Sequence, residues 1–447
     1  MKKYEMDLNG NKLSIETGKI ARQSDGAVMV THGETTVLVA VNAAKEARED
    51  IDFFPLQVEY RERHYAGGKI PGGFFKREAR PSEHEILTSR LTDRPIRPLF
   101  PKSFKNETQV IITVMSSDGE NMADTLAGVG ASAALMVSDI PFSGPIATVR
   151  VGRINDEFVI NPTRSQMEDS DMEIIVSGND QTIVMVEGEA ELITEEVFLD
   201  AMKFAHEPIK ELIDLQNQLT VDLGVEKREI SEEDTNEELE KAVSDLVSSK
   251  IDKAIKIADK GDREDAISLL KEEAIQSFEE SHPESEQLVS NFVNAQLKNA
   301  FREQILSEKK RSDGRKTTDI RPITIETGLL PRTHGSALFT RGETQAIVVL
   351  TMGTPSDEQI IDSMDIDEKK KFFLHYNFPP YCVGETGRIG FTSRREVGHG
   401  NLAERAVKQV LPDYEDFPYT IRMVSEITES NGSSSMASVC GGSLALM

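Results

Sequence analysis

Several features that define common classes of protein are absent from this sequence. It contains no tryptophan and two cysteines, Cys382 and Cys440, which are too few for a disulfide framework or a cysteine zinc cluster. No apolar run approaches the length of a membrane span, and no apolar segment follows the first lysines as a secretory signal would require. These absences favour a protein of the reducing cytoplasm with no membrane partner.

Familiar catalytic motifs are absent as well. The sequence has neither a Walker phosphate-binding loop nor an HExxH zinc site. Residues 128–133 fit a loose dinucleotide fingerprint, but no strand is expected directly before them, so close helix packing explains these small residues better. Cys440 and His399 could form a nucleophile pair. Nothing local activates the thiol, however, and a small buried cysteine is the better interpretation.

The charge of the chain is negative but unevenly distributed. A net charge of −26 argues at first against a polyanionic partner. Residues 231–290 hold 18 acidic and 7 basic side chains, which we interpret as a solvated helical surface. Residues 74–105 hold 8 basic side chains, mostly arginine, and 4 acidic ones. Since the local field captures phosphates, the chain can still bind nucleic acid where these basic residues converge.

The spacing of apolar residues divides the chain into three parts. Residues 1–222 alternate short β-branched runs with helical stretches, which predicts an α+β domain. Between 223 and 306, apolar residues recur every three or four positions, which is typical of a small all-helical domain. Residues 307–447 return to the α+β pattern.

The third part of the chain repeats the first. Residues 16–41 match 326–350 with one residue of slippage, and residues 117–136 match 430–447. Between these blocks lie two trios at identical spacing, namely Arg80, His84 and Arg90, and Arg395, His399 and Arg405. Three matches in the same order indicate a duplicated domain. Because Met447 falls inside the second copy of a helix after which the first copy continues, we expect the second domain to be incomplete.

Arginine, histidine and serine residues remain as candidates for chemistry. They suit reactions of phosphates, in which positioning and charge neutralisation supply most of the catalysis. Ser433, Ser434 and Ser435 open a predicted helix, whose backbone N–H groups and dipole would attract an anion. An ordinary serine N-cap is the alternative. The upstream arginines Arg394 and Arg395, whose guanidinium forks match phosphate oxygens, favour the anion site.

Four blocks of the sequence resemble polynucleotide phosphorylase, at residues 50–74, 72–101, 390–406 and 428–447. The resemblance covers the whole chain, including the helical insert. That family has two α+β ribonuclease-PH-like domains, of the ribosomal S5 domain 2-like fold, which flank an all-α domain and precede KH and S1 RNA-binding domains. The domain boundaries that we expect here are 1–222 and 307–447 for the two ribonuclease-PH-like domains, and 223–306 for the helical domain.

The resemblance implies a phosphorolytic 3′-to-5′ exoribonuclease of mRNA turnover. Inorganic phosphate, the co-substrate, attacks the 3′-terminal linkage of single-stranded RNA and releases nucleoside diphosphates, and the reverse reaction polymerises them. The resemblance further implies a homotrimeric ring, Mg²⁺ or Mn²⁺ as the metal, and an RNA-degrading assembly with an endoribonuclease and a helicase. Ribonuclease PH alone is disfavoured by the duplication and the helical insert.

The resemblance also assigns roles to residues. Ser433, Ser434 and Ser435 match the phosphate-binding serines, and a second group matches the catalytic basic residues beside them: Arg394, Arg395 and His399. The aromatic pair on which RNA bases stack is matched by Phe74 and Phe75, on a glycine-rich loop. Other residues are expected to line the RNA path: Lys76, Arg77, Arg80, Arg90, Arg94 and Arg97. Arg97 has a structural alternative, since it precedes Pro98.

The sequence departs from the family in its carboxylates. The metal-binding aspartates of the family are expected beyond Met447, so no metal ligand is assigned within the chain. The first domain carries Asp118, Glu120 and Asn121 where the second carries serines, and acidic groups there would repel phosphate. As a 447-residue polypeptide the chain is therefore expected to lack phosphorolytic activity, and a non-catalytic RNA-binding or assembly fragment is the alternative function.

Overall fold

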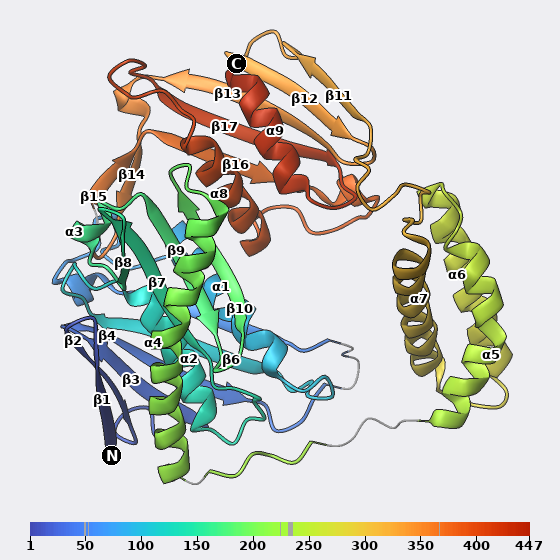
Figure 1. Ribbon diagram of the computed structural model, residues 1–447, viewed down its shortest axis with the longest axis horizontal. Helices are drawn as coiled ribbons and strands as arrows, with labels where there is room; N and C mark the ends of the chain where they lie inside the picture. The colour runs from blue at the N-terminus through green and yellow to red at the C-terminus, as the bar shows by residue number, and fades with distance from the viewer. Residues whose placement is uncertain (49–50, 52, 224, 231–235, 366) are drawn as a thin grey trace. The chain divides into compact units, whose positions relative to one another are not determined.

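The computed structural model describes the chain except for residues 49–50, 52, 224, 231–235 and 366. The chain forms two compact units, one made of residues 1–231 and 323–447 and the other of residues 232–322. Figure 1 shows the elements of both units. No helix in the described residues is long and apolar enough to cross a membrane.

The first domain of the larger unit is built on a six-stranded sheet. Neighbouring strands are antiparallel except for β5 and β6, which are parallel. In spatial order the strands are β1 (Lys2–Leu8), β2 (Asn11–Thr17), β3 (Gly26–His32), β4 (Thr35–Ala43), β6 (Thr108–Ser116) and β5 (Leu56–Glu62). Their alternating apolar residues bury one face, which is the pattern that the sequence predicts. The helices of this domain are η1 (His64–Gly67), α1 (Glu83–Ile96), η2 (Arg97–Leu99) and α2 (Ala123–Met136).

A four-stranded antiparallel sheet completes the first domain, with α2 between the two sheets. Its spatial order is β10 (Ile183–Ala190), β9 (Met172–Gly178), β7 (Ala147–Ile154) and β8 (Glu157–Ile160). The short α3 (Arg164–Met167) follows β8, and the long α4 (Glu195–Leu223) packs on β7 and β9. Every residue of α2 is buried, and a Cβ on Gly130 would lie 2.6 Å from the side chain of Val39. Close helix packing is thus confirmed as the reason for the small residues at 128–133.

The second domain repeats the first sheet without its outermost strand. Its strands in spatial order are β11 (Ile323–Thr327), β12 (Gly335–Arg341), β13 (Gln345–Gly353), β17 (Thr420–Glu429) and β16 (Phe372–Asn377). The order matches β2-β3-β4-β6-β5, and β16 is parallel to β17 as β5 is to β6. Its helices are η3 (Pro355–Asp357), η4 (Pro380–Val383), α8 (Arg394–Lys408) and α9 (Ser434–Leu446), with a small hairpin of β14 (Gln359–Asp362) and β15 (Asp367–Lys370). The duplication predicted from the sequence is confirmed.

Helices α1 and α8 begin with the same capping box, which fixes how the two domains correspond. Ser82 accepts a hydrogen bond from the backbone N–H of Glu85, whose carboxylate accepts one from Ser82 N–H. Ser393 and Glu396 make the same pair of bonds. Such a box satisfies backbone N–H groups that the first helical turn leaves without partners. Glu85 therefore corresponds to Glu396.

This correspondence corrects one detail of the sequence matching. With Glu85 opposite Glu396, His84 corresponds to Arg395, Thr88 to His399 and Arg94 to Arg405. The matching of Arg80, His84 and Arg90 with Arg395, His399 and Arg405 was wrong by one helical turn. Basic residues recur about one turn apart on both helices, so a shift of four residues still pairs like with like.

The described part of the smaller unit contains three helices, α5 (Glu237–Ala254), α6 (Lys260–Phe278) and α7 (Glu286–Glu308). Leu239, Val243 and Val247 form a buried stripe on α5, and Val289 and Val293 do so on α7. The stripes follow the three- and four-residue spacing seen in the sequence, and the acidic side chains of 231–290 that are described lie mainly on exposed positions.

Candidate phosphate and RNA-binding site

The serine turn at the start of α9 leaves backbone donors available. Ser433 is exposed and adopts a left-handed conformation, with a φ of 54°, whereas Ser434 and Ser435 are buried. The Gly432 carbonyl accepts hydrogen bonds from Thr344 Oγ1 and from Arg341. In the described part of the chain, the backbone N–H groups of residues 433–435 have no acceptor. A helix start of this kind is suited to binding an anion.

His399 lies beside this turn on α8. Its ring meets the ring of Tyr376 edge-on at 5.2 Å, and the hydroxyl of Tyr376 is 2.7 Å from Ser434 Oγ. Burial lowers the pKa of His399, and the positive charges of Arg395 and Arg90 lower it further. The imidazole is therefore neutral at neutral pH. Its buried Nδ1 has no partner among the described residues, so the ring can still donate or accept a proton.

Two arginines, one from each domain, converge near His399. Arg395 is exposed, and its guanidinium lies 5.5 Å from the ring centre of Phe378. Arg90 reaches across from α1, where a Cβ on Gly398 would lie 2.5 Å from its Nε. Burial lowers the pKa of Arg90, and the nearby positive charges of Arg94 and Arg395 act in the same direction. Mutually repelling guanidinium groups of this kind are stabilised when they share an anion.

Three other arginines predicted for the site are engaged within the protein. Arg394 donates to the carbonyl of Val58 at 2.6 Å and pairs with Glu59, both on β5. Arg94 pairs with Glu187 on β10, which also accepts from Arg405 at 3.1 Å. Arg97 pairs with Asp93 and donates to the carbonyls of Phe54 and Leu56. The structure thus separates these three side chains from the group formed by Arg90, Arg395 and His399.

The aromatic pair lies on an exposed loop, as the sequence suggests. Phe74 is 94% and Phe75 is 87% exposed, and their rings meet edge-on at 5.4 Å. Lys76 and Arg77 are exposed beside them, although Lys76 Nζ donates to the carbonyl of Gly72 at 3.2 Å. Two large apolar side chains in solvent contribute nothing to a core, which favours a binding role.

Two aromatic residues of this region were not predicted from the sequence. Arg80 lies 4.1 Å from the ring centre of Phe391, which is exposed on the second-domain loop before α8. Tyr376 supports both His399 and Ser434. A signal for Phe391 was present in the sequence, because it follows Gly390 and lies close before basic residues, as Phe74 and Phe75 do. No local signal marked Tyr376, whose partners are 23 and 58 residues away in the chain.

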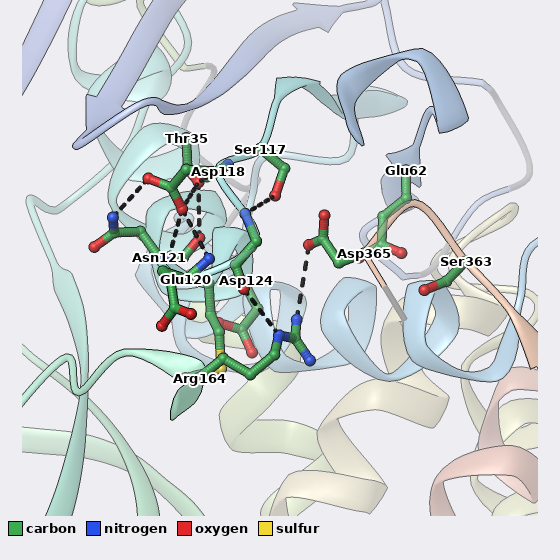
Figure 2. Close-up of polar contacts among 12 residues, drawn as sticks. Thr35, Glu62, Ser117, Asp118, Glu120, Asn121, Asp124, Arg164, Ser363 and Asp365 are labelled. Atoms are coloured by element: carbon green, nitrogen blue, oxygen red, sulfur yellow. Dashed lines mark hydrogen bonds and ion pairs between the residues drawn. The ribbon is translucent and has the colours of Figure 1, made fainter. Parts of the chain in front are cut away.

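The equivalent turn in the first domain is filled by its own carboxylate. Asp118 accepts hydrogen bonds from the backbone N–H groups of Glu34, Glu120 and Asn121, and from Thr35 Oγ1 and Asn121 Nδ2. Figure 2 shows these contacts gathered around Asp118. Burial opposes ionisation, but the bonds from Asn121, Glu120 and Glu34 outweigh it and lower the pKa of Asp118 to about 2. An internal anion thus takes the donors that the second domain leaves available.

We expect Asp118→Ala to lower the free energy of unfolding at pH 7 by about 2–3 kcal/mol, since several donors lose a charged acceptor. The folded pKa of about 2 lies below the ordinary value of 3.8, so this stabilisation is present above pH 3.8 and is lost as the pH falls towards 2. Urea denaturation between pH 2 and 7 measures both effects. Asp169→Ala is the control, because Asp169 is exposed and its carboxylate has no described partner. Equal losses in the two variants would contradict the role of Asp118.

The first domain also has members of ion pairs at two further positions that correspond to site residues. His84, which corresponds to Arg395, lies 3.0 Å from Glu62. His84 is exposed, and its pair with Glu62 raises the pKa of the imidazole. Asp124, at the position of Ser435, pairs with Arg150. Positions that are available in the second domain are therefore neutralised within the protein in the first.

No group of three or more histidine, cysteine, aspartate or glutamate side chains with the arrangement of a metal site occurs among the described residues. Glu343 accepts a hydrogen bond from Asn431 Nδ2 beside the turn, Glu396 is engaged in the capping box of α8, and Glu404 pairs with Lys370 and accepts from the backbone N–H of Leu374.

The shared strand order of the two domains, β2-β3-β4-β6-β5 and β11-β12-β13-β17-β16, defines a protein built on a duplicated α+β domain. Residues 10–141 and 319–447 each match the 3′ exoribonuclease family, domain 1, and residues 144–207 match domain 2 of that family. The chain belongs to the 3′ exoribonuclease family. Residues 238–316, in the helical unit, match the RNA-binding domain of polyribonucleotide nucleotidyltransferase.

Curated relatives named polyribonucleotide nucleotidyltransferase match this chain over its whole length. The polyribonucleotide nucleotidyltransferases of Syntrophotalea carbinolica and Geotalea uraniireducens are 54% and 52% identical over 100% of this chain. The chain spans 64% of the length of each. A crystal structure of rice Rrp46 aligns with 46% of this chain, and the aligned part covers 94% of the Rrp46 chain. The TM-score is 0.39 and the sequence identity is 14%. The similarity to polynucleotide phosphorylase is thus confirmed by the sequence relatives.

Proposed function

We propose that this chain carries the phosphate- and RNA-binding part of a phosphorolytic 3′-to-5′ exoribonuclease of mRNA turnover. One observation carries the proposal: Arg395, Arg90 and the neutral His399 converge beside a serine turn whose backbone N–H groups are available. Phosphoryl transfer is catalysed mainly by positioning and by neutralising charge, which such groups supply. The family match and the name of the relatives support the same reaction.

In this proposal the serine turn, Ser433 to Ser435, binds inorganic phosphate. Arg395 and Arg90 hold the 3′-terminal linkage of the RNA against it. An oxygen of the bound phosphate attacks the terminal phosphorus, and the bond to the 3′ oxygen of the preceding nucleotide breaks. A nucleoside diphosphate leaves, and the shortened RNA keeps its 3′ oxygen, which takes up a proton. His399 is placed to donate or accept that proton, and the same steps in reverse polymerise nucleoside diphosphates.

The other residues of the site follow from their surroundings. Phe74 and Phe75 stack on bases of single-stranded RNA, and Lys76, Arg77 and Arg80 line its path. Arg394, Arg94 and Arg97 have a positioning role and do not contact the RNA, because each is bound to carboxylates or carbonyls of the protein. A divalent metal, Mg²⁺ or Mn²⁺, would neutralise developing charge. We place its carboxylate ligands in the part of the relatives that this chain does not span.

The proposal also includes the assembly of the protein and its location in the cell. Its basis is the sequence resemblance, which implies a homotrimer, a cytoplasmic location and an RNA-degrading assembly with an endoribonuclease and a helicase. Analytical ultracentrifugation tests the trimer directly, both for this chain and for a version extended to the length of the relatives.

The reaction is tested by chromatographic detection of ADP released from poly(A) in the presence of Mg²⁺. We expect ADP from the extended version, in amounts that require added phosphate, and none from the 447-residue chain. Release of AMP in the absence of added phosphate would show that the reaction is hydrolysis and not phosphorolysis. Release of ADP by the 447-residue chain would mean that its own residues bind the metal.

A non-catalytic function is the second candidate for the chain as it stands. It is favoured by the exposure of Phe74 and Phe75, which leaves both rings available to stack on bases. This function predicts that the 447-residue chain binds oligo(A) in the presence of EDTA. Failure to bind would leave assembly as its remaining role.

A further inference from the structure

We propose that the β14–β15 hairpin of the second domain positions the glycine-rich loop of the first domain that carries Phe74 and Phe75. The inference rests on the proposed RNA-binding function of that loop. It assigns positioning roles to Asp362, Met364 and Asp365, which lie at the end of the hairpin.

The end of the hairpin is inserted into the first domain. Met364 is 3% exposed and belongs to the apolar core of that domain. Asp365 forms an ion pair of 3.7 Å with Arg164, the first residue of α3. Figure 2 draws this ion pair. A Cβ on Gly67 would collide with the carbonyl oxygen of Met364, so only glycine permits this approach. The end of the hairpin is therefore closely packed against the first domain.

Asp362 connects the hairpin directly to the aromatic loop. Its Oδ2 accepts a hydrogen bond from Gly72 N–H at 3.1 Å, two residues before Phe74. Its Oδ1 lies 3.6 Å from Nε2 of His64, at the start of η1. Lys69 Nζ donates to the carbonyl of Ser363 at 3.4 Å. The amino-terminal side of the loop is thus held by the second domain.

The carboxyl-terminal side of the loop is held by its own domain. Glu78 accepts a hydrogen bond from the backbone N–H of His64 at 3.1 Å, and Arg61 donates to the carbonyl of Ala79 at 3.0 Å. Between these two attachments, Phe74 and Phe75 are almost fully exposed and have no core to fix them. A loop that must be ordered on binding loses conformational entropy, so anchoring both ends in advance strengthens binding.

The absence of tryptophan provides a direct test in the 447-residue chain. Phe75→Trp introduces a single fluorescent reporter into the loop, with no background from other positions. Asp362→Ala removes the acceptor for Gly72, and Gly67→Ala displaces the hairpin from the other side. We expect each to lower the time-resolved anisotropy of the reporter. In the chain with Phe75 intact, each should also weaken oligo(A) binding by on the order of three- to tenfold.

Glu368→Gln is the matched control. It changes an exposed carboxylate of the same hairpin that has no partner in the described part of the chain, and it should alter neither measurement. Circular dichroism identifies any variant that fails to fold; Asp362 is half-exposed, so its replacement is expected to fold. Unchanged anisotropy in both test variants would overturn the proposal. A second outcome would also overturn it: the test variants lower the anisotropy but leave the oligo(A) affinity unchanged, whereas Phe74→Ala/Phe75→Ala weakens that affinity.

The proposed function fails separately from this inference. If Phe74→Ala/Phe75→Ala leaves the affinity for oligo(A) unchanged, the loop does not bind RNA, and that part of the proposed function is wrong. The anisotropy of the reporter would still decide whether the hairpin holds the loop.

Discussion

Arg395→Ala is expected to lower kcat/KM for phosphorolysis of poly(A) by about 10²–10³, when it is made in a version extended to the length of the relatives. Its guanidinium is exposed beside the neutral His399 and repels Arg90, so an anion shared between the two arginines is strongly stabilised. Lysine at this position keeps the charge but loses the two-pronged hydrogen bonding, so Arg395→Lys should recover only part of the rate. Initial rates at varied phosphate and RNA concentrations measure both variants.

Arg48→Ala provides the control for total charge. Arg48 is exposed and pairs with Glu107 on the surface of the first domain, where an ion pair contributes little. We expect its rate to stay within threefold of the parent, roughly the scatter of a surface substitution. A similar loss in Arg48→Ala and Arg395→Ala would mean that overall charge, and no local site, attracts the RNA. An Arg395→Ala enzyme of full activity would remove this residue from the proposed site.

The duplicated fold could be predicted from the sequence because small and apolar residues determine its packing. Gly26 approaches the carbonyl of Ala134 where β3 meets α2, and Gly335 approaches that of Ala445 where β12 meets α9. Such contacts tolerate only glycine, so they persist in both copies and keep the blocks alignable. The helix register was predicted wrongly because basic residues lie about one turn apart on both helices, so a shift of four residues still pairs like with like.

The site was only partly predictable for a geometric reason. Arg394 and Arg395 are adjacent in sequence, but neighbours on a helix point about 100° apart. One therefore reaches β5 of the first domain while the other lies beside His399. The involvement of Arg90 depends on how α1 packs against α8, which no local pattern encodes. Residue types thus indicated the chemistry, whereas tertiary packing selected which arginines can perform it.

Arg150→Met is expected to produce the largest loss of stability, about 3–5 kcal/mol in the free energy of unfolding. Arg150 on β7 is 4% exposed and Asp124 on α2 is 6% exposed, and their side chains form two hydrogen bonds, of 3.1 and 2.5 Å. Burial opposes the charge on Asp124, but Arg150 outweighs it and lowers the pKa. Methionine fills similar space and leaves that carboxylate buried without its partner. Urea denaturation followed by circular dichroism measures the loss.

Two comparisons show whether the loss comes from the unpaired charge. Asp124→Leu combined with Arg150→Met removes both charges, and we expect it to recover most of the stability. Arg153→Met, on the same strand, breaks a pair with the partly exposed Asp171 and should cost at most about 1 kcal/mol. Because the folded pKa of Asp124 is lowered, its contribution is present above the ordinary carboxyl pKa and is lost as the pH falls through the folded value. Arg150→Met should abolish this acid-dependent loss. A double variant no more stable than Arg150→Met would instead assign the effect to packing around α2, where the first domain has Asp124 at the position of Ser435.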